Sequence, residues 1–144
     1  MKYESIDSKL FIKNRANFSR EMKKNSIAFF NSNDIYPVSA DSTLPFEQHR
    51  DIFYLSGIDQ EESILVLCPD NPNPDLREIL FLKETNDHIA VWEGPKINKT
   101  QALEISGIKT VFWLKDLEKL VDKLVSTCHN IYFNKNEHYR AKIE

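Results

Sequence analysis

The chain has 144 residues, of which 41% are hydrophobic and 28% are charged, and its formal net charge is −3. This is the length and composition of one ordinary globular domain. Acidic and basic residues are interspersed from end to end, which excludes the basic surface that binds nucleic acid. Only three glycines occur, Gly57, Gly94 and Gly107. Their wide spacing excludes the glycine-rich loops that bind dinucleotides or cradle phosphates.

The sequence contains no segment typical of export or of a membrane span. The N-terminus is polar and charged, and the longest aliphatic run, residues 64–68, is far below the ~20 residues that cross a bilayer. We therefore expect a cytoplasmic protein that does not associate with membranes. Cys68 and Cys128 are isolated from each other in the sequence and form no Cys-x-x-Cys pair. In a reducing compartment we expect both to be free thiols that fill apolar space.

In the first half of the chain, the pattern of apolar residues predicts two helices and three strands. Phe11, Phe18 and Met22, with the alkyl stem of Arg15, have the spacing of one buried helix face. A later short helix is expected to stop at Gly57. The expected elements are a helix over 8–24, a strand over 26–31, a loop over 39–45, a helix over 48–55, and strands over 63–68 and 78–83.

The second half continues the alternation, and Asp116 is placed to cap its last helix or to complement that helix's dipole. The expected elements are a strand over 88–92, a helix over 98–105 closed by Gly107, a strand over 109–113, a helix over 117–125 and a strand over 130–133. Most of these strands are too apolar to leave one face in water. We therefore predict an α/β fold, a central mixed six-stranded sheet with helices on both faces, in which the strands near 64, 79 and 89 are antiparallel.

No catalytic motif is complete in this sequence. The four histidines, His49, His88, His129 and His138, lack the spacing of a metal site, and His49 is expected to be a solvated surface residue. Cys128 and His129 are adjacent, a spacing that rarely gives a nucleophile and its base. The acidic run Asp59, Glu61 and Glu62 contains paired carboxylates but favours a solvated loop. The chain is thus predicted to lack a self-sufficient active site.

Two segments carry a more specific pattern. Asp41–Gly57 is a long loop that leads into an aromatic-rich helix, whose Ile52, Phe53 and Leu55 can also be read simply as core. Val91–Lys96 brings a large aromatic, Trp92, to a Gly-Pro turn. Trp92 there either covers the core or is presented to a ligand.

Read with the rest of the chain, these segments form an ordered set of matches: Arg15, Phe18 and Met22; Ser39-Ala40-Asp41-Ser42; Pro45-Phe46 and Gln48; Asp51 to Gly57; Ile64 to Leu67; and Trp92-Glu93-Gly94. The set resembles the N-terminal domain of the Xaa-Pro aminopeptidase, prolidase and creatinase family, most closely aminopeptidase P. The chain departs from the family pattern at Glu47, at Gln60-Glu61 and at Lys96. These departures leave the fold intact and leave open the branch of the family.

The resemblance implies an accessory role within a larger enzyme. Members of the family cleave the bond before a proline in second position, using two divalent ions, commonly manganese, held by a C-terminal pita-bread domain. Residues 1–134 would then form the N-terminal domain and residues 135–144 the start of a linker to that catalytic domain. This segment alone would be inactive and would hold no catalytic or metal-binding residue.

The resemblance also implies partners and two site residues. The partners would be proline-containing peptides, the chain's own C-terminal domain and further copies in a dimer or tetramer, with no nucleic acid and no membrane. Asp41 and Trp92 match positions that wall the substrate cleft, including that of a neighbouring subunit. An indole face suits a rigid proline ring, and a carboxylate suits a substrate's ammonium group. The alternatives are a non-catalytic peptide- or protein-binding module of the same fold, and the N-terminal domain of a prolidase or creatinase.

Overall fold

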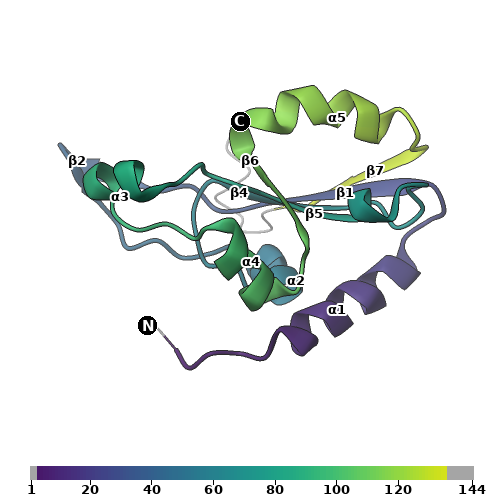
Figure 1. Cartoon of the computed structure of the whole chain (residues 1–144), viewed down its shortest axis with the longest axis horizontal. Coiled ribbons are helices and arrows are strands. Elements are labelled where there is room, and N and C mark those ends of the chain that lie inside the picture. Colours follow the sequence, from purple (N-terminus) through teal and green to yellow (C-terminus); the bar gives the residue numbers. More distant parts are fainter. Residues whose placement is uncertain (1–2, 136–144) are drawn as a thin grey trace.

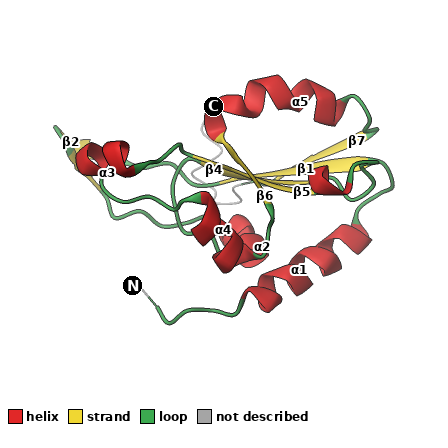
Figure 2. Ribbon diagram, viewed as in Figure 1, coloured by secondary structure: helices red, strands yellow, loops and turns green. Residues whose placement is uncertain are grey.

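The computed structural model describes residues 3–135, and these form a sheet covered on both faces (Figure 1). His138 and all but the first residue of the expected linker lie outside the described residues. The helices α1 (Ser8–Glu21), α2 (Arg50–Ser56) and α4 (Lys99–Ser106) lie on one face, and α5 (Leu117–Val125) lies on the other (Figure 2). This arrangement confirms the predicted α/β fold with helices on both faces.

The main sheet has the order β6-β5-β4-β1-β7. Its strands are β1 (Ser26–Asn31), β4 (Ser63–Leu67), β5 (Glu78–Leu82), β6 (Thr110–Trp113) and β7 (Asn130–Phe133). The pairs β1–β4 and β4–β5 are antiparallel, whereas β1–β7 and β5–β6 are parallel. The sheet is therefore mixed, and the antiparallel pairing expected near residues 64 and 79 is confirmed.

The sheet has five strands in the described residues, so the prediction of six is wrong. The expected strand over 88–92 is the short helix α3 (Asp87–Glu93). The side chain of Asn86 accepts a hydrogen bond from the Ile89 amide and starts this helix. Val91 and Trp92 are 76% and 77% exposed, so this apolar run has no sheet face to cover. The N-cap therefore outweighs the strand preference of the run's β-branched and aromatic residues.

Smaller differences occur elsewhere in the chain. The segment expected to be a loop over 39–45 contains a hairpin of β2 (Pro37–Ser39) and β3 (Ser42–Thr43). Helix α1 ends at Glu21, three residues earlier than predicted. Two 3-10 turns, Pro74–Leu76 and Leu114–Asp116, complete the elements. The Asp116 side chain makes no capping hydrogen bond, which leaves only its charge to favour the start of α5.

The core consists of two layers, one on each side of the sheet. Under α1, α2 and α4 lie the strand residues Ala28, Phe30, Leu65, Leu67, Leu80 and Leu82. Under α5 lie Ile27, Phe29, Val66, Ile79 and Phe81. Successive residues of the central strands thus point into opposite layers, which explains why these strands read as continuous apolar runs.

Helices α2 and α4 end in the same way. Each ends in the sequence Ser-Gly-Ile, over residues 56–58 and 106–108. In both, the serine hydroxyl donates to the carbonyl four residues earlier at 2.6 Å and accepts from the isoleucine amide. Both glycines have left-handed backbone angles, with φ of 71° and 74°. The prediction that glycines close these two helices is confirmed.

Helix α1 packs closely against both of these helix ends. A Cβ atom on Gly57 would lie 2.4 Å from the Phe11 ring, and one on Gly107 would lie 2.6 Å from Ile12. Between them Arg15 is fully buried: its Nε donates to Glu78 at 3.1 Å, and a terminal nitrogen donates to the Leu55 carbonyl at 2.8 Å. A buried charge is tolerated only when it is paired in this way. Arg15 thus joins α1 to the end of α2 and to β5.

Candidate functional site

The two predicted site residues lie on two elements that extend beyond the same end of the main sheet, the β2–β3 hairpin and α3 (Figure 1). Asp41 occupies the hairpin turn, after Ala40 with its φ of 47°, and is exposed. Trp92 lies near the end of α3, two residues before Gly94. Both side chains are therefore presented outward, and Trp92 does not cover the core.

Large apolar side chains on these two elements, and next to the hairpin strands, are exposed. Their exposed fractions are 69% for Tyr36, 57% for Val38, 52% for Leu44, 76% for Val91 and 77% for Trp92. Scattered single apolar residues are normal on a protein surface, but a concentration of them marks a surface that another molecule covers. We call these five residues the outer apolar surface.

Helix α3 is fixed to the body of the domain on both sides. Before the helix, Lys83 forms ion pairs with Glu62 at 3.3 Å and with Glu93 at 3.1 Å. The hydrogen bonds that Lys83 donates to the carboxylates of Glu93 and Glu62 raise the pKa of Lys83. After the helix, Lys96 pairs with Glu61, which lies in the same loop as Glu62. These contacts connect both ends of α3 to the rest of the domain, and the Trp92 side chain itself is in solvent.

In the acidic run after α2, Glu61 is largely buried, which corrects the expectation of a solvated loop at that residue, whereas the Glu62 side chain is 52% exposed. The Glu61 side chain is 13% exposed. Burial alone would raise its pKa, but the hydrogen bond and charge of Lys96, with the charge of Lys83, lower it. Gln60 is buried, and its side-chain oxygen accepts from the Ile97 amide at 2.8 Å. The run therefore supplies a fixed anion and an acceptor to the segment that follows α3.

Other matched residues also serve the scaffold. The Gln48 amide nitrogen donates to the carbonyls of Ile58 and Gln60, both at 3.0 Å, and its oxygen accepts from the His49 amide. His49 accepts through Nδ1 from the Asp51 amide and so caps α2. Its side chain is 17% exposed, so the expectation of a solvated surface histidine is wrong. These residues position the chain on either side of α2.

The described residues build no metal centre. Among residues 3–135, no group of three or more His, Cys, Asp and Glu side chains is placed to hold a metal ion. The sulfur of Cys128 contacts Cys68 and the Leu124 carbonyl, and the His129 amide donates to Asn25. In the same part of the chain, no helix is both long and apolar enough to cross a membrane.

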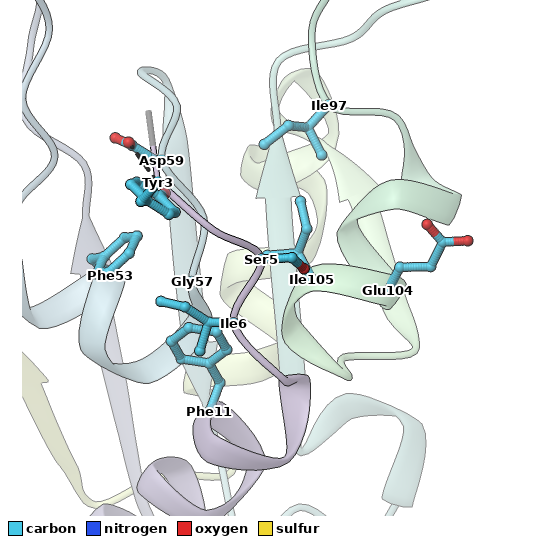
Figure 3. A pocket seen from close by; sticks show the side chains of 10 residues that line it. All are labelled: Tyr3, Ser5, Ile6, Phe11, Phe53, Gly57, Asp59, Ile97, Glu104 and Ile105. Carbon is cyan, nitrogen blue, oxygen red and sulfur yellow. Dashed lines mark hydrogen bonds between the residues drawn. The ribbon is translucent and has the colours of Figure 1, made fainter. Parts of the chain in front are cut away.

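A separate hollow of about 430 Å³ lies between the N-terminal segment, α2 and α4. Tyr3 and Phe53 line one side of it, and Glu104 and Ile105 line the other (Figure 3). The Tyr3 hydroxyl donates to Asp59 at 3.3 Å; burial and the Asp59 charge raise the pKa of Tyr3 to about 12. Neither Asp41 nor Trp92 lines this hollow, so it is distinct from the outer apolar surface.

The sequence and fold of this chain are similar to those of known proteins. Human Xaa-Pro aminopeptidase 3 is 27% identical over 105 residues, which cover 72% of this chain and 21% of that protein. Intermediate cleaving peptidase 55 of Saccharomyces cerevisiae is 28% identical over 127 residues, or 86% of this chain and 24% of the relative. A solved structure from Bacillus anthracis, provisionally described as an aminopeptidase P, is 25% identical with a TM-score of 0.85, and the match covers 96% of this chain and 33% of that one.

The chain thus spans about a fifth to a third of the length of these proteins. The family model for the aminopeptidase P N-terminal domain matches residues 11–132. That match includes every strand of the main sheet except the last residue of β7, together with α2, α3 and the β2–β3 hairpin. The chain belongs to the aminopeptidase P N-terminal domain family.

Proposed function

We propose that this chain is the N-terminal accessory domain of a cytoplasmic Xaa-Pro aminopeptidase, which removes the residue that precedes a proline from the amino end of a peptide. Residues 1–134 form the domain, and residues 135–144 lead toward a catalytic domain. The family membership and the names of the relatives support this function. In this proposal the metal ions, two divalent cations such as Mn²⁺, belong to the catalytic domain.

In this proposal the domain shapes the substrate cleft through Trp92 and Asp41. The observation that carries it is the 77% exposure of Trp92 on a helix that ion pairs fix before and after it. A large indole kept in water by a rigid support suits contact with another molecule. Its flat face can pack on the proline ring of a peptide, while the Asp41 carboxylate attracts the peptide's ammonium end.

The outer apolar surface also supports an oligomer. Apolar residues lie close in the sequence to both predicted site residues: Tyr36, Val38 and Leu44 flank Asp41, and Val91 precedes Trp92. Their exposed apolar area is surface that a second subunit would remove from water. A dimer or tetramer that buries this surface would place Asp41 and Trp92 at the cleft of a neighbouring subunit. The site would then be assembled from two copies.

The accessory role can be tested by incubating the full-length protein and, separately, residues 1–144 with Mn²⁺ and an Xaa-Pro peptide. We expect the full-length protein to release the N-terminal residue and the short chain to release none. Turnover by residues 1–144 would contradict the accessory role. A full-length protein without activity would indicate the non-catalytic binding module. Release only from Xaa-Pro dipeptides would indicate a prolidase.

A further inference from the structure

The chain's two cysteines meet in the folded domain, although 60 positions separate them in the sequence. Cys68 directly follows β4, and Cys128 lies three residues after α5. Their sulfur atoms are 3.5 Å apart. The sequence alone presents them as unrelated, and the packing of α5 on the sheet brings them together.

The two thiols differ in access to solvent. Cys68 is 2% exposed, and burial, followed by the neighbouring Cys128 and the charge of Asp70, raises the pKa of Cys68 to about 12. Cys128 is half-buried, and its thiol lies 3.4 Å from the Leu124 carbonyl, to which it donates. An oxidant from solvent therefore reaches Cys128 first, and the buried Cys68 is the thiol adjacent to it.

We propose that Cys68 and Cys128 form an oxidative modification site, in which peroxide converts the two thiols to an intramolecular disulfide. Hydrogen peroxide transfers one oxygen to the Cys128 sulfur, giving a sulfenic acid and one water. The Cys68 sulfur then attacks the Cys128 sulfur, the S–O bond breaks, and the hydroxyl leaves with the Cys68 proton as a second water. The thiol pair loses two electrons, and the peroxide O–O bond gains them.

The geometry requires only a small movement. The sulfurs must approach by about 1.5 Å to reach a disulfide bond length of about 2.0 Å. Cys128 lies in the connection between α5 and β7, outside the helix and the strand. Cys68 is fixed by its position at the end of β4 and by its amide hydrogen bond to the Arg77 carbonyl.

The bond would fasten α5 to the sheet that it covers. It closes a loop of about 60 residues, which restricts the unfolded chain and stabilises the folded one. For a domain of this size we expect the melting temperature of the oxidised form to exceed that of the reduced form by roughly 5–10 °C. Addition of dithiothreitol should reverse the shift.

The test uses the 144-residue chain, treated with hydrogen peroxide, unfolded, alkylated with iodoacetamide and weighed by mass spectrometry. We expect a monomer that has lost two hydrogen atoms and takes up no alkyl group, with a peptide that contains Cys68 linked to one that contains Cys128. Full alkylation of both thiols after oxidation would overturn the proposal. So would a disulfide that joins two chains, or a Cys128 sulfinic acid beside a free Cys68.

Two single variants give matched controls. In Cys68→Ser, Cys128 should stop at the sulfenic acid, which dimedone traps. In Cys128→Ser, the buried Cys68 should remain alkylatable after the same peroxide treatment. Neither variant should show the rise in melting temperature. An equal rise in either variant would mean that the bond between these sulfurs is not its cause.

Discussion

We expect Gly57→Ala to destabilise the domain more than Gly107→Ala, its matched control. Both substitutions place an L-residue in the left-handed backbone region at the end of a helix. The difference between their free energies of unfolding measures the additional cost of packing a methyl group against α1. The two glycines have nearly the same left-handed φ, 71° and 74°, and each follows a buried serine. They differ in what a methyl group would meet. At Gly57 it meets the ring of Phe11, and at Gly107 it meets the tip of the Ile12 side chain.

The backbone term is about 1–2 kcal/mol at either position, since an L-residue in this region brings its Cβ close to a carbonyl oxygen. At Gly57 the new Cβ would lie 2.4 Å and 2.6 Å from two atoms of Phe11, whose ring is 3% exposed and packs edge-on against Phe53. Overpacking of this kind adds about 1–3 kcal/mol. Ile12 is 44% exposed and can swing into solvent. We therefore expect losses of about 2–5 kcal/mol for Gly57→Ala and about 1–2 kcal/mol for Gly107→Ala.

Urea unfolding of the 144-residue chain, followed by far-ultraviolet circular dichroism, measures both losses. A double-mutant cycle with Phe11→Ala isolates the clash: in that background Gly57→Ala should cost only the backbone term of about 1–2 kcal/mol. Equal losses for the two alanine variants, or a larger loss at Gly107, would refute the conclusion that the Phe11 ring is fixed against this helix end.

Three other predictions concern charge and titration. Arg15→Met should lower the free energy of unfolding by about 1–3 kcal/mol in urea titrations, because it leaves the buried Leu55 carbonyl without its donor and removes the ion pair with the partly exposed Glu78; a loss below about 1 kcal/mol would contradict this role. Because the folded state holds the pKa of Cys68 at about 12 against an ordinary 9.0, its contribution to stability is present below pH 9 and is lost as the pH rises toward 12. The urea midpoint should fall over that range, less steeply in Cys68→Ala, and equal slopes would contradict the assignment. In the full-length protein, Asp41→Asn should lower kcat/KM for Xaa-Pro peptides several-fold at low salt and less at high salt, since salt screens an exposed charge; a salt-independent effect would contradict an electrostatic role.

The strands of the main sheet were predictable from the sequence because most of them are buried on two faces. Segments such as Ile64–Leu67 and Ile79–Leu82 are wholly apolar and bounded by turn residues, a pattern that favours a buried strand. The helix ends at Gly57 and Gly107 were predictable for an equally local reason, since each glycine adopts the left-handed angles that stop a helix.

The features that escaped prediction depend on distant contacts or on one competing local signal. Asn86 caps the N-terminus of α3, and the exposed Val91 and Trp92 do not pack on a sheet. The segment that follows Asn86 is therefore a helix, despite its strand-forming residues. The anchoring role of Glu61 requires Lys96, which lies 35 residues away. No sequence spacing predicts such a pair. The acidic run could be recognised as an anchor only once α3 was placed.

The proximity of Cys68 and Cys128 is another feature that depends on a distant contact. It follows from the packing of α5 against the sheet and has no counterpart in the local sequence around either cysteine. For the candidate site, the sequence identified Asp41 and Trp92 only through a family resemblance. The structure adds their exposure and the ion pairs that hold α3, which residue types alone do not reveal.

The most direct test of the cleft-shaping role is kcat/KM of the full-length protein for an Xaa-Pro peptide, measured for Trp92→Ala beside Tyr54→Ala. Tyr54 is an exposed aromatic on α2, 57% accessible, and lies outside the outer apolar surface. If the indole covers about 60 Å² of proline ring, its loss costs about 1.5 kcal/mol, a roughly tenfold fall in kcat/KM. We predict that fall for Trp92→Ala, with unchanged metal content, and no change for Tyr54→Ala. Unchanged kcat/KM in Trp92→Ala, or an equal fall in both variants, would contradict the account.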